Sequence, residues 1–144
     1  LHKTLTDVAD AIQQKLIDRY GLTFTQHQFD ALVSFTFNLG TSWMTYDSTL
    51  RNAILRNANE DDLLYAFGLY CTAGGSYSSG LINRRLCEAN MYLKRQATLT
   101  DMYSMSPTEE ALPIRYRDLY TETIRPLRRM RCAETMYFLA GIQT

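Results

Sequence analysis

The sequence has few of the residues that hold a metal or activate a nucleophile. It contains only two histidines, His2 and His27, and neither has a second histidine or a cysteine at metal-ligand spacing. No phosphate-binding loop, dinucleotide-binding fingerprint, serine-hydrolase elbow or zinc-protease motif occurs. We therefore expect neither a metal site nor a cofactor.

Net charge and long apolar runs are also absent. The 15 basic and 15 acidic side chains balance to zero, so no overall field attracts a polyanion, and we expect no nucleic-acid partner. No run of apolar residues is long enough to cross a bilayer. The first residues lack the charged and apolar parts of a signal peptide, so we expect neither a membrane span nor a secretion signal in this chain.

Cysteine usage does not indicate a disulfide framework. Cys71, Cys87 and Cys132 are an odd number without CxxC spacing, which leaves at least one thiol unpaired in a monomer. Free cysteine is often buried, so we interpret them as small apolar core residues, with a disulfide between Cys71 and Cys87 as the alternative. The 144 residues are enough for one hydrophobic core without such a bridge.

No alternating strand pattern stands out, and helical spacing of apolar residues predicts an all-α fold. A first helix is predicted over residues 4–20, ended by Gly21. A second, apolar around most of its circumference, is predicted to begin after the cap Thr25 and to end at Gly40. Its inward face is predicted to contain Phe29, Leu32, Val33, Thr36 and Phe37, with Ala31 and Phe35 at its margins.

The middle of the chain is predicted to hold three further helices. A loop over residues 41–47 contains the only tryptophan, and Ser48 and Asn59 are predicted helix caps. The third of these helices is predicted over residues 81–96, after Gly80. Its inward residues are predicted to be Leu81, Leu86, Ala89, Met91, Tyr92 and Leu93.

Two arginines in that helix precede an acid by one turn. Arg84 and Arg85 lie four and three residues before Glu88, a spacing that predicts a structural ion pair. Contact of an arginine with a saccharide or a phosphate is the alternative.

The composition changes near residue 97. All three prolines follow residue 100, and the last stretch is rich in arginine. We therefore predict a lobe of about five helices over residues 1–97 and an appended helical tail over residues 98–144 that packs on it. We interpret the arginines as a solvated helix face, with a contact to a partner as the alternative.

Four motifs in order carry a resemblance to a known family. They are QFDALVSFTFNLG at residues 28–40, STL at 48–50, AGG at 73–75 and GLINRRLCEA at 80–89. Together they resemble the phage-type lysozymes, a glycoside hydrolase family that includes endolysins, over residues 22–93. The resemblance implies a lysozyme-like helical lobe, muramidase activity on the glycan strands of peptidoglycan, and a cleft lined by Phe37, Asn38, Gly40, Gly74 and Gly75.

The family's catalytic pattern is not found before these motifs. Its members place a glutamate, an aspartate and a threonine there, in a helix and β-hairpin with an EGxxxxxYxD…TIGYG pattern, whereas the first glutamate here is Glu60. Residues 4–20 resemble the helix that connects the two lobes. We therefore expect the catalytic segment to lie upstream in a longer phage endolysin or secreted antibacterial effector. Such a protein would act in the bacterial periplasm or cell wall, and an immunity or inhibitor protein would be a further partner.

One pair of acids in the tail repeats the family's spacing. Glu109 and Asp118, with Tyr116 between them, would form a circularly permuted catalytic pair. No glycine follows Glu109 and Pro113 interrupts the segment, so we interpret the spacing as accidental. The alternative function is a catalytically inactive lysozyme-derived module that binds glycan or a protein.

Overall fold

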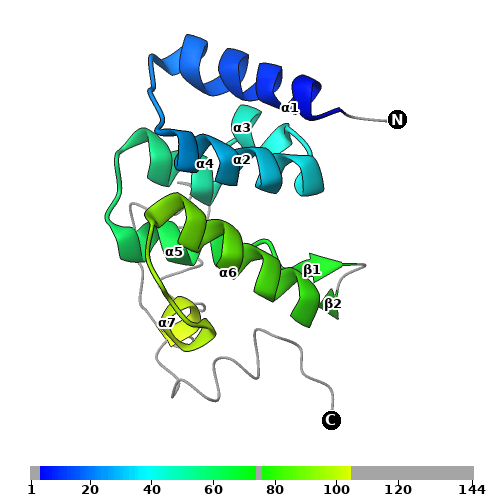
Figure 1. Cartoon of the computed structure of the whole chain (residues 1–144), viewed down its shortest axis with the longest axis vertical. Helices are drawn as coiled ribbons and strands as arrows, with labels where there is room; N and C mark the ends of the chain where they lie inside the picture. Colours follow the sequence, from blue (N-terminus) through cyan, green and yellow to red (C-terminus); the bar gives the residue numbers. More distant parts are fainter. Residues whose placement is uncertain (1–3, 74–75, 105–144) are drawn as a thin grey trace.

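The computed structural model describes residues 4–73 and 76–104, and helices dominate them (Figure 1). The elements are α1 (Leu5–Ile12), the π-helical segment η1 (Gln13–Asp18), α2 (Gln26–Leu39), α3 (Ser42–Thr45), α4 (Thr49–Leu55), α5 (Glu60–Gly68), β1 (Thr72–Ala73), β2 (Ser76–Tyr77), α6 (Ser79–Leu93) and α7 (Leu99–Ser104). The two strands form one short antiparallel pair, with Ala73 opposite Ser76. The all-α prediction is confirmed.

The first helix begins at the predicted cap and stays amphipathic where its α-helical part, α1, continues into the π-helical segment η1. Thr4 Oγ1 accepts a hydrogen bond from the Asp7 backbone N–H, and the Asp7 side chain accepts one from Thr4 N–H. Its buried side chains are Val8, Ile12 and Leu16, so the π-helical segment η1 continues the same inward stripe. Gly21 then adopts a φ of +68°, which favours glycine.

The central helix α2 has the predicted ends but a slightly different inward face. Thr25 and Gln28 form a reciprocal capping box, and Gly40 ends the helix with a φ of +86°. The buried residues are Ala31, Leu32, Phe35 and Thr36. The prediction that Phe37 faces inward is wrong, because its side chain points away from the core and is 47% exposed.

Trp43 lies in a short helix, α3, rather than in the predicted loop. Its indole is buried, and its Nε1–H donates to Thr36 Oγ1 at 3.1 Å. Its ring meets Phe35 edge to face, with centroids 5.3 Å apart. This burial holds the segment in a helical turn against α2. The caps predicted for α4 and α5 are confirmed, since Ser48 and Asn59 each accept from a backbone N–H three residues later.

Helix α6 starts and ends earlier than predicted, and its inward face differs. Ser78 caps it, so Gly80 lies within its first turn, and it ends at Leu93. The buried face consists of Ile82, Arg85, Glu88, Ala89 and Tyr92. Met91, predicted to face inward, is 43% exposed. The reason is that α6 packs against both α2 and α5 (Figure 1). The face of α6 that lies between them carries the ion pair of Arg85 and Glu88.

The core joins α2, α5 and α6 through aromatic side chains. Phe35 meets Phe67 and Tyr70 edge to face, with ring centroids 5.4 and 5.0 Å away, and Phe67 contacts Tyr92. Helix α7, the first part of the predicted tail, packs on α5 and α6 with Met102 fully buried. Glu109, Asp118 and the rest of the tail lie outside the described residues.

Candidate functional site: the contact between α2 and α6

Arg84 and Glu88 connect α6 to the middle of α2. Arg84 Nη2 donates to the Ser34 carbonyl at 3.1 Å, and Arg84 Nε contacts Glu88 Oε2 at 3.2 Å. The same carboxylate oxygen accepts a hydrogen bond from Ser34 Oγ at 2.5 Å. The Arg84 side chain is 42% exposed, whereas that of Glu88 is only 3% exposed. Arg84 therefore takes part in the contact between the two helices and is also accessible to solvent.

Arg85 makes a second connection, in the interior. Its side chain is fully buried, and its Nη2 donates to Asn38 Oδ1 at 2.8 Å. Its Nη1 donates to the Tyr70 carbonyl at 3.5 Å, and its Cζ lies 5.1 Å from the centre of the Phe35 ring. Arg85 thus joins the end of α2 to the segment that enters β1.

Arg85 and Glu88 form an ion pair inside the protein. Arg85 Nε lies 2.8 Å from Glu88 Oε1. Burial lowers the pKa of Arg85, and the charge of Glu88 opposes that shift. A guanidinium nevertheless stays charged at neutral pH. We refer to Ser34, Asn38, Arg84, Arg85 and Glu88 as the α2–α6 polar cluster.

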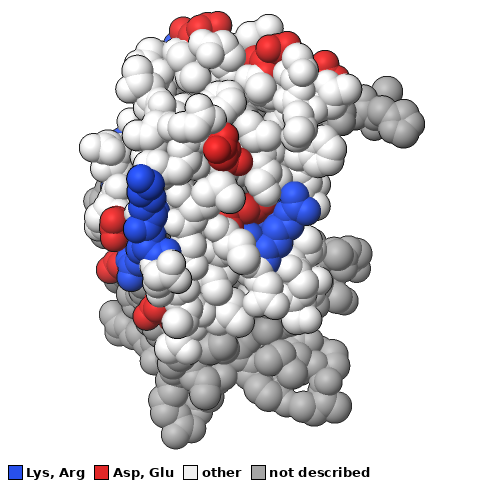
Figure 2. Space-filling model, in the orientation of Figure 1, with Lys and Arg blue, Asp and Glu red and all other residues white. Residues whose placement is uncertain are grey.

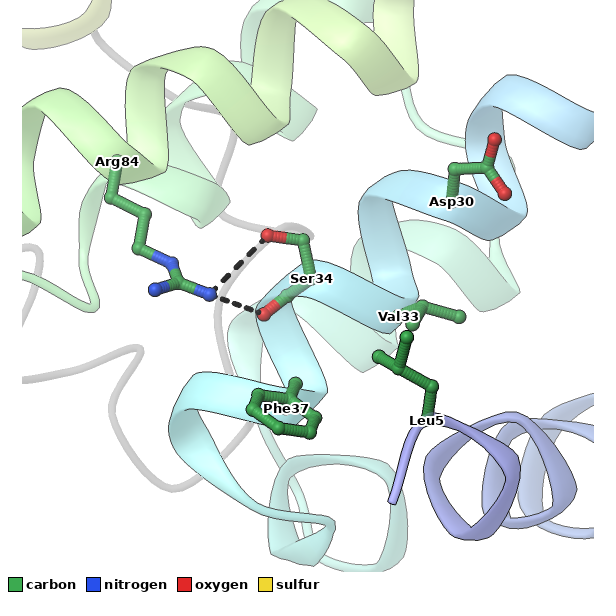
Figure 3. Close-up of a pocket in the computed structure, with 6 residues that line it drawn as sticks. All are labelled: Leu5, Asp30, Val33, Ser34, Phe37 and Arg84. Atoms are coloured by element: carbon green, nitrogen blue, oxygen red, sulfur yellow. Dashed lines mark hydrogen bonds between the residues drawn. The ribbon is translucent and has the colours of Figure 1, made fainter. Parts of the chain in front are cut away.

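A pocket of about 330 Å³ lies beside the outer part of this cluster (Figure 3). It is lined by residues of α1, α2 and α6, namely Leu5, Asp30, Val33, Ser34, Phe37 and Arg84. In Figure 3, Arg84 reaches from α6 to Ser34, Phe37 stands one turn further along α2, and the Asp30 carboxylate is directed away. The exposed Leu5 and Phe37 make part of the wall apolar.

The residues implied as a cleft lining fall partly within this region. Phe37 lines the pocket, and Asn38 is exposed at the end of α2, next to Gly40. Gly74 and Gly75 lie outside the described residues, but the base of their hairpin is closed by a hydrogen bond from Ser78 N–H to the Cys71 carbonyl at 3.0 Å.

Sequence reasoning missed the pocket residues Leu5, Asp30, Val33 and Ser34 as a group. A signal for Ser34 was present, because it lies four residues before Asn38 and therefore shares its side of the helix. Leu5 had no such signal, since it comes from another helix.

A comparison with known protein families identifies this chain. A family model described as phage lysozyme matches residues 1–88. The chain belongs to the phage lysozyme family. The match covers α1 to α5 and reaches into α6 as far as Glu88, so it contains the whole polar cluster. Neither the curated proteins nor the solved structures contain a match.

Membership in the phage lysozyme family indicates peptidoglycan as the substrate class and the cell wall as the place of action. None of the helices in residues 4–73 and 76–104 is long and apolar enough to span a bilayer. Figure 2 shows a mostly uncharged face on which basic side chains adjoin acidic ones in its middle, whereas acidic groups lie along the upper edge, over α1. Over the described ranges, no three His, Cys, Asp or Glu side chains are grouped as metal ligands.

The carboxylates beside the pocket do not have the environment of a proton donor. Glycoside hydrolysis requires an acid within reach of the leaving oxygen. Glu88 is buried, and its two oxygens contact two guanidinium groups and the Ser34 hydroxyl. Asp30 is exposed and accepts a hydrogen bond from Gln26 Nε2 at 2.7 Å. The first carboxylate therefore stabilises the contact between helices, and the second is directed away from the pocket.

Proposed function

We propose that this chain is the substrate-binding helical lobe of a peptidoglycan muramidase whose proton donor comes from a segment outside these 144 residues. The observation that carries this proposal is the contrast within the α2–α6 polar cluster. Its carboxylate, Glu88, is buried between two arginines, whereas Arg84 lines the pocket together with Phe37, and Asn38 is exposed one residue further along α2. These groups can hold a sugar, but no acid among them is free to protonate one.

The pocket chemistry supports glycan binding. Small-molecule sites combine apolar walls with a few polar groups that fix orientation, and a volume of about 330 Å³ lies at the small end of their range. The exposed ring of Phe37 can pack against the apolar face of a pyranose. Arg84 and Ser34 supply donors and acceptors for hydroxyl groups at the neighbouring wall.

Binding to insoluble purified peptidoglycan, measured by co-sedimentation, tests this proposal. Phe37→Ser removes the aromatic wall of the pocket and is expected to lower the bound fraction several-fold. Met91→Ser is the matched control, because Met91 is apolar and exposed to a similar degree, 43% against 47%, but lies outside the pocket. Equal binding by the two variants, or no binding by the unmodified chain, would contradict the proposal.

The second candidate is a lysozyme-derived module that has lost catalysis and binds glycan or a protein partner, such as an inhibitor or immunity protein. The observation that favours it is the exposed apolar pair of Leu5 and Phe37, which could equally receive a protein segment. The coding sequence ahead of Leu1 distinguishes the two. A glutamate-glycine helix followed by a TIGYG-like hairpin supports the muramidase, of endolysin or effector type, and its absence there supports the module.

A further inference from the structure

The ion pairs beside the pocket leave one positive charge without a counterion. Arg84 and Arg85 both pair with Glu88, so two guanidinium groups share one carboxylate. We propose that Arg84 binds a free carboxylate of the short peptides attached to the glycan strands, so that the pocket prefers these stem peptides in their acidic form to their amidated form. The inference rests on the proposed function, because it takes peptidoglycan as the ligand.

Only Arg84 brings this positive charge to the surface. The Arg85 side chain is fully buried, whereas that of Arg84 is 42% exposed and lines the pocket. The other charged residue of the lining, Asp30, is directed away (Figure 3). Within residues 4–73 and 76–104, no ion pair joins Asp30 to Arg84. A ligand in the pocket therefore meets a cation that the protein itself neutralises only in part.

Arg84 has two N–H groups that the described part of the chain does not use. A guanidinium has five N–H donors. The donor on Nε faces Glu88, and the two on Nη2 face the carbonyl and hydroxyl oxygens of Ser34 at 3.1 and 3.5 Å (Figure 3). Over the described ranges, Nη1 has no hydrogen-bond partner. A carboxylate is a strong acceptor for such a group, because the hydrogen bond is between opposite charges.

Covering Arg84 with a neutral ligand would be unfavourable. Displacing water from a guanidinium without supplying a negative charge costs free energy, whereas a carboxylate compensates for the lost hydration. A carboxamide supplies a carbonyl oxygen but no charge, so it compensates only in part. The pocket should therefore discriminate between two forms of the same group, the carboxylate and the carboxamide.

The rest of the pocket fits the apolar part of a short peptide. Leu5, Val33 and Phe37 form its apolar wall, and Leu5 and Phe37 are 62% and 47% exposed. Its volume of about 330 Å³ lies at the small end for ligand sites, so it holds only a short part of the polymer. Stem peptides combine apolar side chains with carboxylates, and the pocket offers an apolar wall next to a cation.

Co-sedimentation of the full chain with two forms of one peptidoglycan preparation tests the inference. The preparation is freed of phosphate-containing polymers, so that its anions are carboxylates. One portion is treated with a carbodiimide and ammonia, which converts the carboxylates into carboxamides, and the other with ammonia alone. We expect the acidic form to bind about fivefold more tightly, the effect of one partly exposed ion pair. This preference should shrink at about 1 M salt, where the Debye length is about 3 Å.

Substitutions of Arg84 test whether its charge causes the preference. Arg84→Gln removes the charge and keeps a polar side chain, so it should bind the two forms equally. Arg84→Lys keeps the cation, so part of the preference should remain. Arg19→Gln is the matched control, because it makes the same change at an exposed arginine outside the pocket, and it should keep the full preference.

Three results would overturn the inference while the chain still binds peptidoglycan. They are equal binding of the two forms by the unmodified chain, an undiminished preference in Arg84→Gln, and equal loss of the preference in Arg84→Gln and in either Arg84→Lys or Arg19→Gln. In the last case the preference would not depend on a cation at this position. Failure of the unmodified chain to bind either form would instead overturn the proposed function itself.

Discussion

Arg84 and Arg85 are neighbours in the sequence, yet they occupy opposite environments. Consecutive residues on a helix point about 100° apart, so Arg85 enters the interior between α2 and α5 while Arg84 stands at the rim of the pocket. Both contact Glu88. One carboxylate therefore pairs with a buried arginine and with a substantially exposed one at the same time.

The largest expected effect comes from removing the buried arginine. Arg85→Met leaves Glu88 without its interior partner and removes the bonds to Asn38 and Tyr70. Breaking a buried pair in this way should lower the free energy of unfolding by about 3–5 kcal/mol. Urea denaturation followed by circular dichroism measures it. A loss below about 1 kcal/mol would show that the pair contributes no more than a surface contact.

Glu88→Gln should have the next largest effect. It leaves the Arg85 charge buried without a counterion, but the new amide oxygen can still accept from Ser34. We expect a loss of about 2–3 kcal/mol, measured in the same denaturation experiment. Asp10→Asn, an exposed acid on α1, is the control and should change stability by less than about 0.5 kcal/mol.

Ser34→Ala removes the hydrogen bond that α2 donates to the shared carboxylate. The bond is to a charged group but is only partly buried, so we expect a loss of about 1–2 kcal/mol. Ser79→Ala, at an exposed position in the first turn of α6, provides the comparison. Equal stabilities of the two variants would indicate that Ser34 and Glu88 do not interact in solution.

Arg84→Met should affect stability least. Its side chain is substantially exposed, so solvent screening weakens its ion pair with Glu88. We therefore expect the free energy of unfolding to fall by no more than about 1 kcal/mol. Peptidoglycan binding should nevertheless decrease, because the pocket loses its cation. A stability loss as large as that of Arg85→Met would remove the distinction between the two arginines.

The sequence predicts the two ends of α2 well because their causes are local. Thr25 with Gln28 forms a capping box through a contact of three residues, and Gly40 supplies the positive φ where α2 stops. The family assignment likewise follows from motifs read along the chain. The tertiary location of side chains is a different matter, because it depends on partners far away in sequence.

The burial of Arg85 could not be predicted from local sequence. Its burial depends on Asn38, 47 residues earlier, and on aromatic packing around Phe35. Helical periodicity alone places apolar side chains such as Met91 inward and charged ones outward, and both assignments are reversed here. The pocket was unpredictable for the same reason, since it combines Leu5 of α1 with Arg84 of α6.

We propose above that this lobe holds peptidoglycan and does not cut it by itself. The most direct measurement is the release of soluble muropeptides from purified peptidoglycan by the 144-residue chain alone, quantified by mass spectrometry. We expect no release above that of a heat-denatured sample, under conditions in which the chain sediments with the polymer. Release of muropeptides in proportion to the amount of chain would contradict the claim and would place a complete catalytic site within these residues.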